Sequence, residues 1–325
     1  SSNFHPYGSL YFDGTYFYGT TNEGPGAGRG GTIFKIKPDG SGFTTLLNID
    51  QGRNPYGSLI SDGTFLYGMT YSSVQNLNGI IFKIKPDGTG YASIYNFNGY
   101  SDGGSPLGSL ISDGIFLYGM TRSGGIKKNG TIFKIKPDGS SFAKLFDFDG
   151  SSNGSAPRGD LFYDGKFLYG MTFQGGIYSG GTLFKLKTDG TYFVKLQEFG
   201  DPSFGETNPY ASLISDGSNL FGTVDGGTNH FGAVFKFDLT TNGINNLCQQ
   251  NDIIISPNPA TNELNIQTKT DQKVQVQMFD MNGKLVLEDS FIQNLTFNIH
   301  NLPKGIYFIK CTGEAGVMTR KIVIE

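Results

Sequence analysis

Short apolar runs recur along the first 248 residues of the chain, separated by polar turns that are rich in Gly and Asp. The clearest run has the pattern GSLISDGTFLYGMT, and its five copies begin 49, 51, 51 and 52 residues apart. A Pro lies two residues before each copy. The copies cover Gly8–Thr21, Gly57–Thr70, Gly108–Thr121, Gly159–Thr172 and Ala211–Val224. Self-similarity at a fixed period indicates a repeat architecture, so the fold is predicted one repeat at a time.

Each repeat is predicted to form four short strands. A second apolar block, TIFKIKPDG or a variant of it, follows each copy and begins at Thr32, Ile80, Thr131, Thr182 and Ala233. The Asp-Gly pairs between apolar runs favour hairpin turns, because Gly adopts positive φ without steric cost. In the second repeat, the predicted strands are Ser58–Ile60, Phe65–Thr70, Ile81–Lys85 and Tyr91–Phe97.

A sheet of this size carries large side chains on both faces and cannot bury them alone, so neighbouring sheets must stack. A period of about 50 residues with four strands is typical of a β-propeller blade. We therefore predict an all-β fold in which residues 1–250 form a five-bladed β-propeller. The last blade is expected to be completed by Ile244–Cys248. An open solenoid is the alternative arrangement.

The repeats resemble a known family. Blocks such as DGKFLYGMTFQGGIYSGGTLFKLKTDG, at Asp164–Gly190, are similar to the Gloeobacter/Verrucomicrobium-type tandem repeat of bacterial surface proteins. The resemblance covers about residues 6–248 and rests on the recurring YGMT…GGTIFKI pattern. It implies an extracellular, propeller-like array, and the family has no assigned common activity.

After Cys248 the repeat stops and the strand spacing changes. Val274, Val276 and Met278 alternate with polar Gln residues, which is the period of a half-buried strand. About seven short strands in residues 251–325 indicate a small immunoglobulin-like β-sandwich. The predicted strands are Ile253–Ser256, Glu263–Thr268, Lys273–Asp280, Lys284–Glu288, Leu295–Ile299, Gly305–Cys311 and Val317–Ile324.

This second domain resembles the C-terminal sorting domain of type IX secretion substrates in Bacteroidota. The matching pieces are the PNP motif, the MFDMNGKLV hairpin, the NLPKGIYFIK segment and the closing RKIVIE. The resemblance implies export to the outer membrane, the cell surface or the medium, and recognition by an outer-membrane shuttle barrel and translocon. It further implies a sortase and attachment to anionic lipopolysaccharide. The recognition residues that it implies are Pro257, Asn258, Pro259, Gly283, Leu302, Pro303, Gly305, Tyr307, Lys321, Ile322, Val323 and Ile324.

Both ends of the chain fit this expectation. Ile322–Ile324 is an apolar strand at a chain end, and such a strand can pair with a partner through backbone hydrogen bonds. An ordinary last strand of the sandwich is the alternative. The sequence begins at Ser1 without Met, as expected after removal of a signal peptide, although a trimmed sequence would look the same.

Composition narrows the function classes. Gly contributes 49 of 325 residues, which disfavours long helices, and the net charge of −3 gives no footprint for nucleic acid. Cys248 and Cys311 lie in different predicted domains, so two free, partly buried thiols are favoured over one bridge between domains. The three His residues do not have metal-ligand spacing, and no cofactor or metal is predicted.

Ligand contacts are predicted on the face that carries the long, divergent loops, because binding residues favour variable loops on a rigid scaffold. These loops join the second strand to the third and the fourth strand to the next repeat, and the latter set adds Arg53, Tyr100, Arg158 and Phe204. The candidates are Tyr71, Arg122, Phe173, Tyr178 and His230. Unselected drift of these loops is the alternative.

Catalysis is not expected. Asp62 and its equivalents in the other repeats are interpreted as turn residues. Asp160, which replaces a Ser of the innermost strand, is the one carboxylate expected to face the central channel, and one carboxylate is not an acid/base pair.

Three hypotheses for function remain. The first is an exported, non-enzymatic surface protein whose loop face binds a glycan or a protein. The second is an accessory component of the type IX secretion or gliding machinery that keeps its sorting domain. The third is a glycan-cleaving propeller enzyme.

Overall fold

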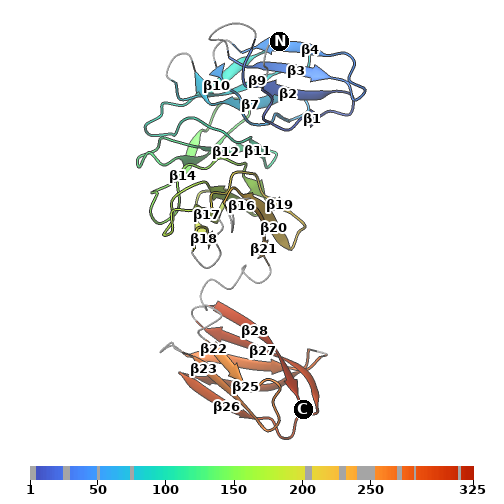
Figure 1. The fold of residues 1–325 in the computed structure, drawn as a ribbon, viewed down its shortest axis with the longest axis vertical. Helices are drawn as coiled ribbons and strands as arrows, with labels where there is room; N and C mark the ends of the chain where they lie inside the picture. The colour runs from blue at the N-terminus through green and yellow to red at the C-terminus, as the bar shows by residue number, and fades with distance from the viewer. Residues whose placement is uncertain are drawn as a thin grey trace. The chain divides into compact units, whose positions relative to one another are not determined.

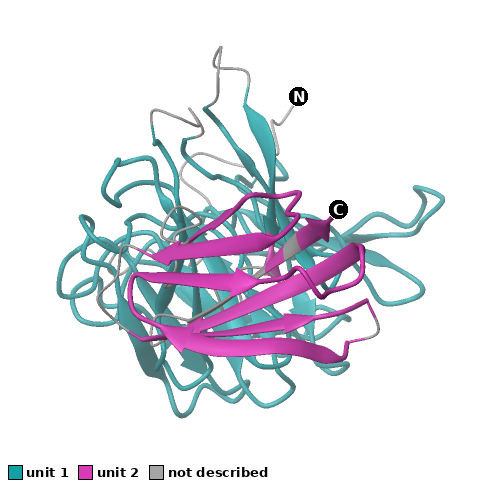
Figure 2. Ribbon diagram, turned by 90° about the horizontal axis from the view of Figure 1, so that it is seen from below, with its two compact units in different colours: residues 1–237 teal, residues 238–325 magenta. Residues whose placement is uncertain are grey.

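The computed structural model describes residues 5–24, 30–49, 52–73, 77–201, 207–226, 232–239, 253–268, 273–281, 283–313 and 316–325. The chain divides into two compact units, residues 1–237 and 238–325 (Figure 2). The bounded elements are all β-strands, which confirms the all-β prediction. The predicted boundary after residue 250 lies outside the described residues and stays a prediction.

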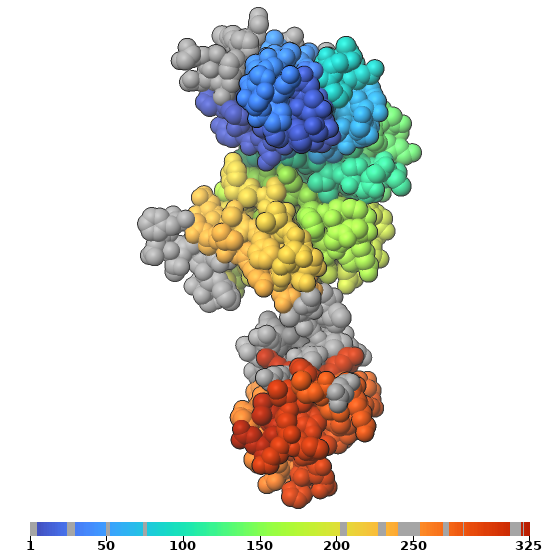
Figure 3. Space-filling view, turned by 90° about the vertical axis from the view of Figure 1, so that its right-hand side faces the viewer, coloured from blue at the N-terminus to red at the C-terminus, as the bar shows by residue number. Residues whose placement is uncertain are grey.

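In the first unit, each repeat forms its own antiparallel sheet, with strands in chain order (Figure 1). The space-filling view shows successive parts of this unit from blue through green to yellow (Figure 3). The first sheet contains β1 (Tyr11–Phe12), β2 (Phe17–Thr21), β3 (Thr32–Ile36) and β4 (Thr44–Asn48). The second contains β6 (Ile60–Ser61), β7 (Leu66–Thr70), β9 (Ile80–Ile84) and β10 (Ala92–Asn96). The third contains β11 (Ile111–Ser112), β12 (Leu117–Thr121), β13 (Thr131–Ile135) and β14 (Ala143–Asp147).

The later repeats follow the same plan. The fourth sheet contains β15 (Phe162–Tyr163), β16 (Phe167–Thr172), β17 (Thr182–Lys187) and β18 (Val194–Glu198). In the fifth repeat, the described strands are β19 (Ile214–Ser215), β20 (Asn219–Val224) and β21 (Ala233–Asp238). Its predicted fourth strand, Ile244–Cys248, lies outside the described residues. A two-stranded ribbon, β5 (Gly52–Arg53) with β8 (Ser72–Ser73), links two of the loops.

The innermost strands differ from the prediction. The predicted strand Ser58–Ile60 is replaced by β6, which pairs with β7 only at Ile60 and Ser61. The residues before it approach the next repeat instead, so closely that a Cβ on Gly57 would lie 2.4 Å from the carbonyl oxygen of Gly108. The residues just before the inner strands of the first four repeats therefore lie against the next repeat.

Neighbouring sheets share apolar cores, as the repeat pattern predicts. Tyr67 and Met69 of β7 pack with Leu117 of β12 and Phe133 of β13, and all four side chains are buried. Equivalent cores join the first sheet to the second and the third to the fourth. Gly68 is required in such a core, because a Cβ there would lie 2.6 Å from Cζ of Phe82.

The two end sheets each leave one face open. Leu10 of the first repeat is 48% exposed, whereas its equivalents Leu59 and Leu110 are 3% and 1% exposed. Val234 of the fifth sheet is 74% exposed, whereas its equivalent Ile132 is fully buried. Within the described residues these two faces are not sealed against each other, so a closed ring of five blades stays a prediction.

The second unit is a two-sheet sandwich with its own core. One sheet has the order β22 (Ile253–Ser256), β23 (Glu263–Thr268) and β26 (Asn294–Asn298). The other has the order β25 (Leu285–Phe291), β24 (Val274–Phe279), β27 (Gly305–Gly313) and β28 (Gly316–Ile324). Their inward side chains form one buried cluster that includes Val276, Ile309 and Cys311. The seven predicted strands are all present.

Candidate functional site

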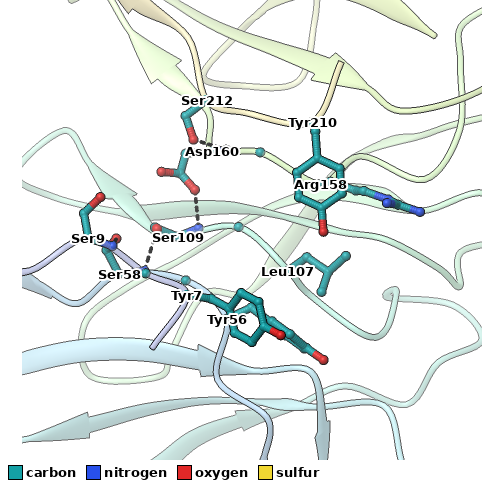
Figure 4. Close-up of a pocket in the computed structure, with 14 residues that line it drawn as sticks. Tyr7, Ser9, Tyr56, Ser58, Leu107, Ser109, Arg158, Asp160, Tyr210 and Ser212 are labelled. Carbon is teal, nitrogen blue, oxygen red and sulfur yellow. Dashed lines mark hydrogen bonds between the residues drawn. The ribbon is translucent and has the colours of Figure 1, made fainter. Parts of the chain in front are cut away.

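The inner ends of the repeats are joined by a row of hydrogen bonds. In each of them a backbone N–H of one repeat donates to a side-chain oxygen of the next repeat. The backbone N–H of Ser9 donates to Oγ of Ser58 at 2.8 Å, and that of Ser58 donates to Oγ of Ser109 at 2.8 Å. The N–H of Ser109 donates to Oδ1 of Asp160, whose own N–H donates to Oγ of Ser212 at 3.0 Å (Figure 4). Every repeat therefore contributes one equivalent residue to this row of hydrogen bonds. In the fourth repeat that residue is Asp160 where the others have a Ser, as predicted.

A cavity of about 190 Å³ lies over this row, and every repeat contributes to its lining. We call it the axial pocket. Its floor is the Ser/Asp row, and its rim consists of the residue that follows the Pro of each repeat. The rim residues are Tyr7, Tyr56, Leu107, Arg158 and Tyr210. The backbone of this position is repeated, but its side chain varies, which is the arrangement expected of a binding site.

Aromatic contacts extend the rim outward. The rings of Tyr7 and Tyr56 lie 5.2 Å apart, and Tyr71 meets Tyr56 edge-on at 5.7 Å. On the other side, Phe173 meets Tyr210 edge-on at 6.0 Å. Tyr71 and Phe173 therefore support the rim of the axial pocket but do not line it.

Arg158 is held in the rim by ring contacts. Its guanidinium carbon lies 3.4 Å from the ring centroid of Phe173 and 5.0 Å from that of Tyr210. Its Nε is buried without a hydrogen-bond partner. Among the described residues, the ion pairs involve other side chains, so the charge of Arg158 is not neutralised by a carboxylate.

The other predicted contacts are placed differently. Arg122 donates from one guanidinium nitrogen to the hydroxyl of Tyr71 at 3.0 Å, one shell outside the pocket. Tyr178 is 45% exposed on its loop and does not line the pocket, and His230 lies outside the described residues. Binding by these five residues stays a prediction. The rim Tyr residues were missed, although a variable position inside a nearly invariant Pro-x-Gly-Ser pattern was a usable signal.

The repeated aspartates perform turn chemistry, as the sequence indicated, and those of the first four repeats also pair with a Tyr. Oδ1 of Asp62 accepts the N–H groups of Thr64 and Phe65 at 2.8 Å each, and its Oδ2 accepts the hydroxyl of Tyr67 at 2.7 Å. Burial raises the pKa of Asp62, but these hydrogen bonds outweigh it, and the pKa lies below its ordinary value. Burial and the Asp62 charge raise the pKa of Tyr67 above its ordinary value. These carboxylates are structural and lie outside the axial pocket.

In the second unit, the motif residues fold against the last strand. Val323 donates its N–H to Oδ1 of Asn258 at 2.9 Å and accepts the N–H of Ala260 at 2.8 Å. Glu325 donates to the carbonyl of Ala260 at 2.9 Å. The end of β28 is therefore already paired on its outer edge, so a partner could add a strand there only by displacing this segment. Ile322 and Ile324 are buried in the sandwich core.

Other predicted recognition residues shape the same unit. The hydroxyl of Tyr307 donates to the carbonyl of Pro303 at 2.7 Å, and Leu302 packs against the core. Gly283 has φ of 78°, as its hairpin turn requires. Gly305 and Lys321 lie in the β27–β28 ladder, opposite Ile324 and Phe308. Recognition by these residues stays a prediction.

The described residues offer neither a metal centre nor a membrane helix. In the ranges given above, no group of three or more His, Cys, Asp or Glu residues is placed to hold a metal ion. In the same ranges, no helix has the length and apolarity that crossing a membrane would require. Cys311 is buried in the sandwich core. Cys248 lies outside the described residues, so pairing of the two Cys residues stays untested.

Two family profiles match the sequence and together cover nearly all of it. The Gloeobacter/Verrucomicrobia repeat matches residues 2–125 and 111–269. The secretion system C-terminal sorting domain matches residues 255–325. The sorting domain implies export to the cell surface, the outer membrane or the extracellular space, and it indicates interaction with the type IX secretion machinery. Among curated proteins, none matches this sequence.

Three solved structures are similar to this chain over part or most of its length. A chain in a nidogen/laminin complex is 21% identical, with a TM-score of 0.50, over 72% of this chain and 76% of that chain. A protein from Bacteroides vulgatus with an immunoglobulin-like β-sandwich is 21% identical, with a TM-score of 0.21, over 23% of this chain and 85% of that chain. TolB from Acinetobacter baumannii is 13% identical, with a TM-score of 0.47, over 87% of this chain and 65% of that chain. The likeness to the chain in the nidogen/laminin complex, with a TM-score of 0.50 and 21% identity, concerns the fold alone.

Proposed function

Because this chain belongs to the Gloeobacter/Verrucomicrobia repeat family and ends in a secretion sorting domain, we propose that it is an exported binding protein of the cell surface. Its first unit binds a glycan or a protein through the axial pocket. Its second unit is the sorting domain that the secretion machinery recognises.

One observation supports binding at the axial pocket more than any other. Each repeat contributes the same two backbone positions to the pocket, but the side chains there range from Tyr and Leu to Arg, and from Ser to Asp. Folding alone does not require that the positions whose side chains differ between repeats lie around one cavity. Loops and strand ends on a rigid repeat are the usual place for recognition.

We propose that the axial pocket binds its ligand without cleaving it. Asp160 is the only carboxylate among the described lining residues, and its Oδ1 is occupied by the N–H of Ser109. Glycoside hydrolysis normally requires two carboxyl groups that flank the bond. The single carboxylate among the described lining residues supports binding rather than glycan cleavage.

The second unit supports the proposed delivery route. We assign its partners as the outer-membrane shuttle barrel and translocon, followed by a sortase that links the first unit to anionic lipopolysaccharide. The mass of the surface form distinguishes this from the alternative: loss of the second unit supports anchored cargo. Retention of the full mass would instead favour an accessory component of the secretion or gliding machinery.

The test of binding uses a rim residue and a matched control. Full-length protein is applied to arrays of immobilised polysaccharides and extracellular proteins, and the same is done with Tyr210→Ala and Tyr192→Ala. Tyr192 is exposed and lies outside the pocket, so its variant should bind like the unchanged chain. The proposal expects Tyr210→Ala to lose at least tenfold in affinity for whatever the unchanged chain binds. Equal binding by both variants, or no binding by any of them, would contradict it.

A further inference from the structure

The axial pocket holds a cation that the protein has positioned but not paired. Arg158 packs in the corner that the rings of Phe173 and Tyr210 form, with its guanidinium carbon 3.4 Å and 5.0 Å from their centroids. Its Nε is buried without an acceptor, and the described carboxylates that form ion pairs do so with other residues. A guanidinium group held in this way presents a planar fork that matches a carboxylate.

The floor offers a different chemistry from the rim. Oγ of Ser58, Ser109 and Ser212 each accept a backbone N–H from the neighbouring repeat, so each hydroxyl hydrogen remains to be donated. Oδ1 of Asp160 is used in the same row, while its second oxygen points away from Ser109 (Figure 4). The floor can therefore donate several hydrogen bonds and accept at least one, which suits a ligand that carries several hydroxyl groups.

The rim adds flat apolar surface beside these polar groups. Tyr7, Tyr56 and Tyr210 present ring faces and hydroxyl groups around the opening. Aromatic side chains combine a large apolar body with a polar tip, and so they suit a ligand with both C–H faces and hydroxyl groups. The cavity, about 190 Å³, is smaller than the ~300–1,000 Å³ of a typical drug-sized site, so it admits one small unit of a larger molecule.

From these features together, we infer that the axial pocket binds an acidic sugar unit, with the sugar carboxylate on Arg158 and its hydroxyl groups over the floor. This inference rests on the proposed function and names its ligand class. An acidic peptide side chain could satisfy Arg158, but it would leave the hydroxyl groups of the floor without matching partners. A neutral sugar could satisfy the floor, but it would leave Arg158 unpaired. An acidic sugar satisfies both.

The test is calorimetric titration of the full chain with three probes: a galacturonate trimer, a neutral maltotriose and a tripeptide that contains Glu. The galacturonate trimer should bind best, and added salt should weaken it. Arg158→Gln should reduce its affinity at least tenfold, and Arg158→Lys should also reduce it because Lys lacks the planar fork. Lys166→Gln removes a charge from the same repeat outside the pocket and should change nothing. Unaltered melting temperatures show that the variants are folded.

Each other outcome overturns a defined part of the account. Equal binding of the neutral and acidic sugars, unaffected by Arg158→Gln, would refute the acidic sugar while leaving a binding pocket. Preference for the tripeptide, lost in Arg158→Gln, would assign the pocket to a peptide carboxylate and also refute the inference. If none of the probes binds and Tyr210→Ala behaves like the unchanged chain on the arrays, the proposed function fails as well.

Discussion

The inner sheets of the first unit and its two end sheets have closely related sequences but different surroundings. Leu110 and its neighbours are buried between sheets, while Leu10 occupies the same place in the repeat and is 48% exposed. Each repeat therefore carries apolar side chains for both faces of its sheet, even where no neighbouring sheet covers one of those faces. Burial in the inner sheets comes from stacking, not from the individual sheet.

Charge introduced at these two equivalent positions should give the largest contrast. Leu110→Asp places a carboxylate in a closed apolar core and should lower the free energy of unfolding of the first unit by about 4 kcal/mol or more. Leu10→Asp should cost less than about 1 kcal/mol, because its site is half open to water. Urea unfolding measures both. Equal losses would show that the first sheet is covered in solution, as a closed ring requires.

A smaller contrast should follow from the glycines beneath these leucines. A Cβ on Gly119 would lie 2.6 Å from Cζ of Phe133, which is fully buried and cannot move aside. Gly119→Ala should therefore cost about 1–3 kcal/mol. In Gly19→Ala the clashes are with Leu10 and Phe34, each at 2.7 Å, and both side chains are only partly covered and can shift. A cost for Gly19→Ala as large as that for Gly119→Ala would argue against an open end face.

The Asp–Tyr pairs sharpen the comparison further, because the fifth repeat has Phe221 where the others have a Tyr. Tyr118→Phe removes the hydroxyl that Asp113 accepts at 2.7 Å and should cost about 1 kcal/mol. Asp216 of the fifth repeat accepts from Asn219 instead, so Phe221→Tyr should not produce a matching gain. Urea midpoints at pH 7 would detect both effects.

These pairs also set how stability depends on pH. Hydrogen bonds hold the pKa of Asp13, Asp62 and Asp113 below the ordinary value despite burial, which acts in the opposite direction. Their contribution should be complete above about pH 4 and lost as the pH falls through the lowered values. Burial and the partner carboxylate raise the pKa of Tyr118, so its contribution should be complete below about pH 10 and lost at higher pH. Tyr118→Phe should flatten the alkaline part of the profile; an unchanged alkaline slope would contradict this assignment.

An effect as small as that of Tyr118→Phe is expected in the second unit, which has a core of its own. Asn258→Ala removes the side-chain acceptor for the N–H of Val323 and should cost the sandwich about 1 kcal/mol. Hydrogen exchange at the end of β28 should increase, while the first unit remains unchanged. Faster exchange in both units would show that the two do not unfold independently.

Local patterns predicted most of the fold. The Asp-Gly turns and apolar runs located the repeat strands, and all seven sandwich strands were anticipated, two of them, Ile253–Ser256 and Glu263–Thr268, with the bounds observed. The predicted closure of the ring could not be derived from one repeat, because Leu10 and Leu110 occupy the same place in the repeat but differ in what covers them. The hydrogen bond from the Tyr67 hydroxyl to Asp62 was not predicted, because the turn motif explains the bonds to only one oxygen of the Asp62 carboxylate.

The candidate site was predicted only in part. Asp160 was expected at the channel because it breaks a repeat, and it lies in the pocket floor. The rim Tyr residues were overlooked because a Tyr beside a Pro is also consistent with an ordinary turn. Their gathering around one cavity depends on how the sheets stack, which the sequence of one repeat does not contain.

The most direct test of the account measures display and binding on the same cells. Intact Bacteroidota cells that express the chain are labelled with an antibody against the first unit and with fluorescent oligogalacturonate. We predict that Arg158→Gln keeps the antibody signal and loses the sugar signal, whereas deletion of Lys321–Glu325 loses both. Normal display after the deletion would contradict a sorting function of the second unit. Undiminished sugar labelling of Arg158→Gln would contradict an acidic-sugar site in the first unit.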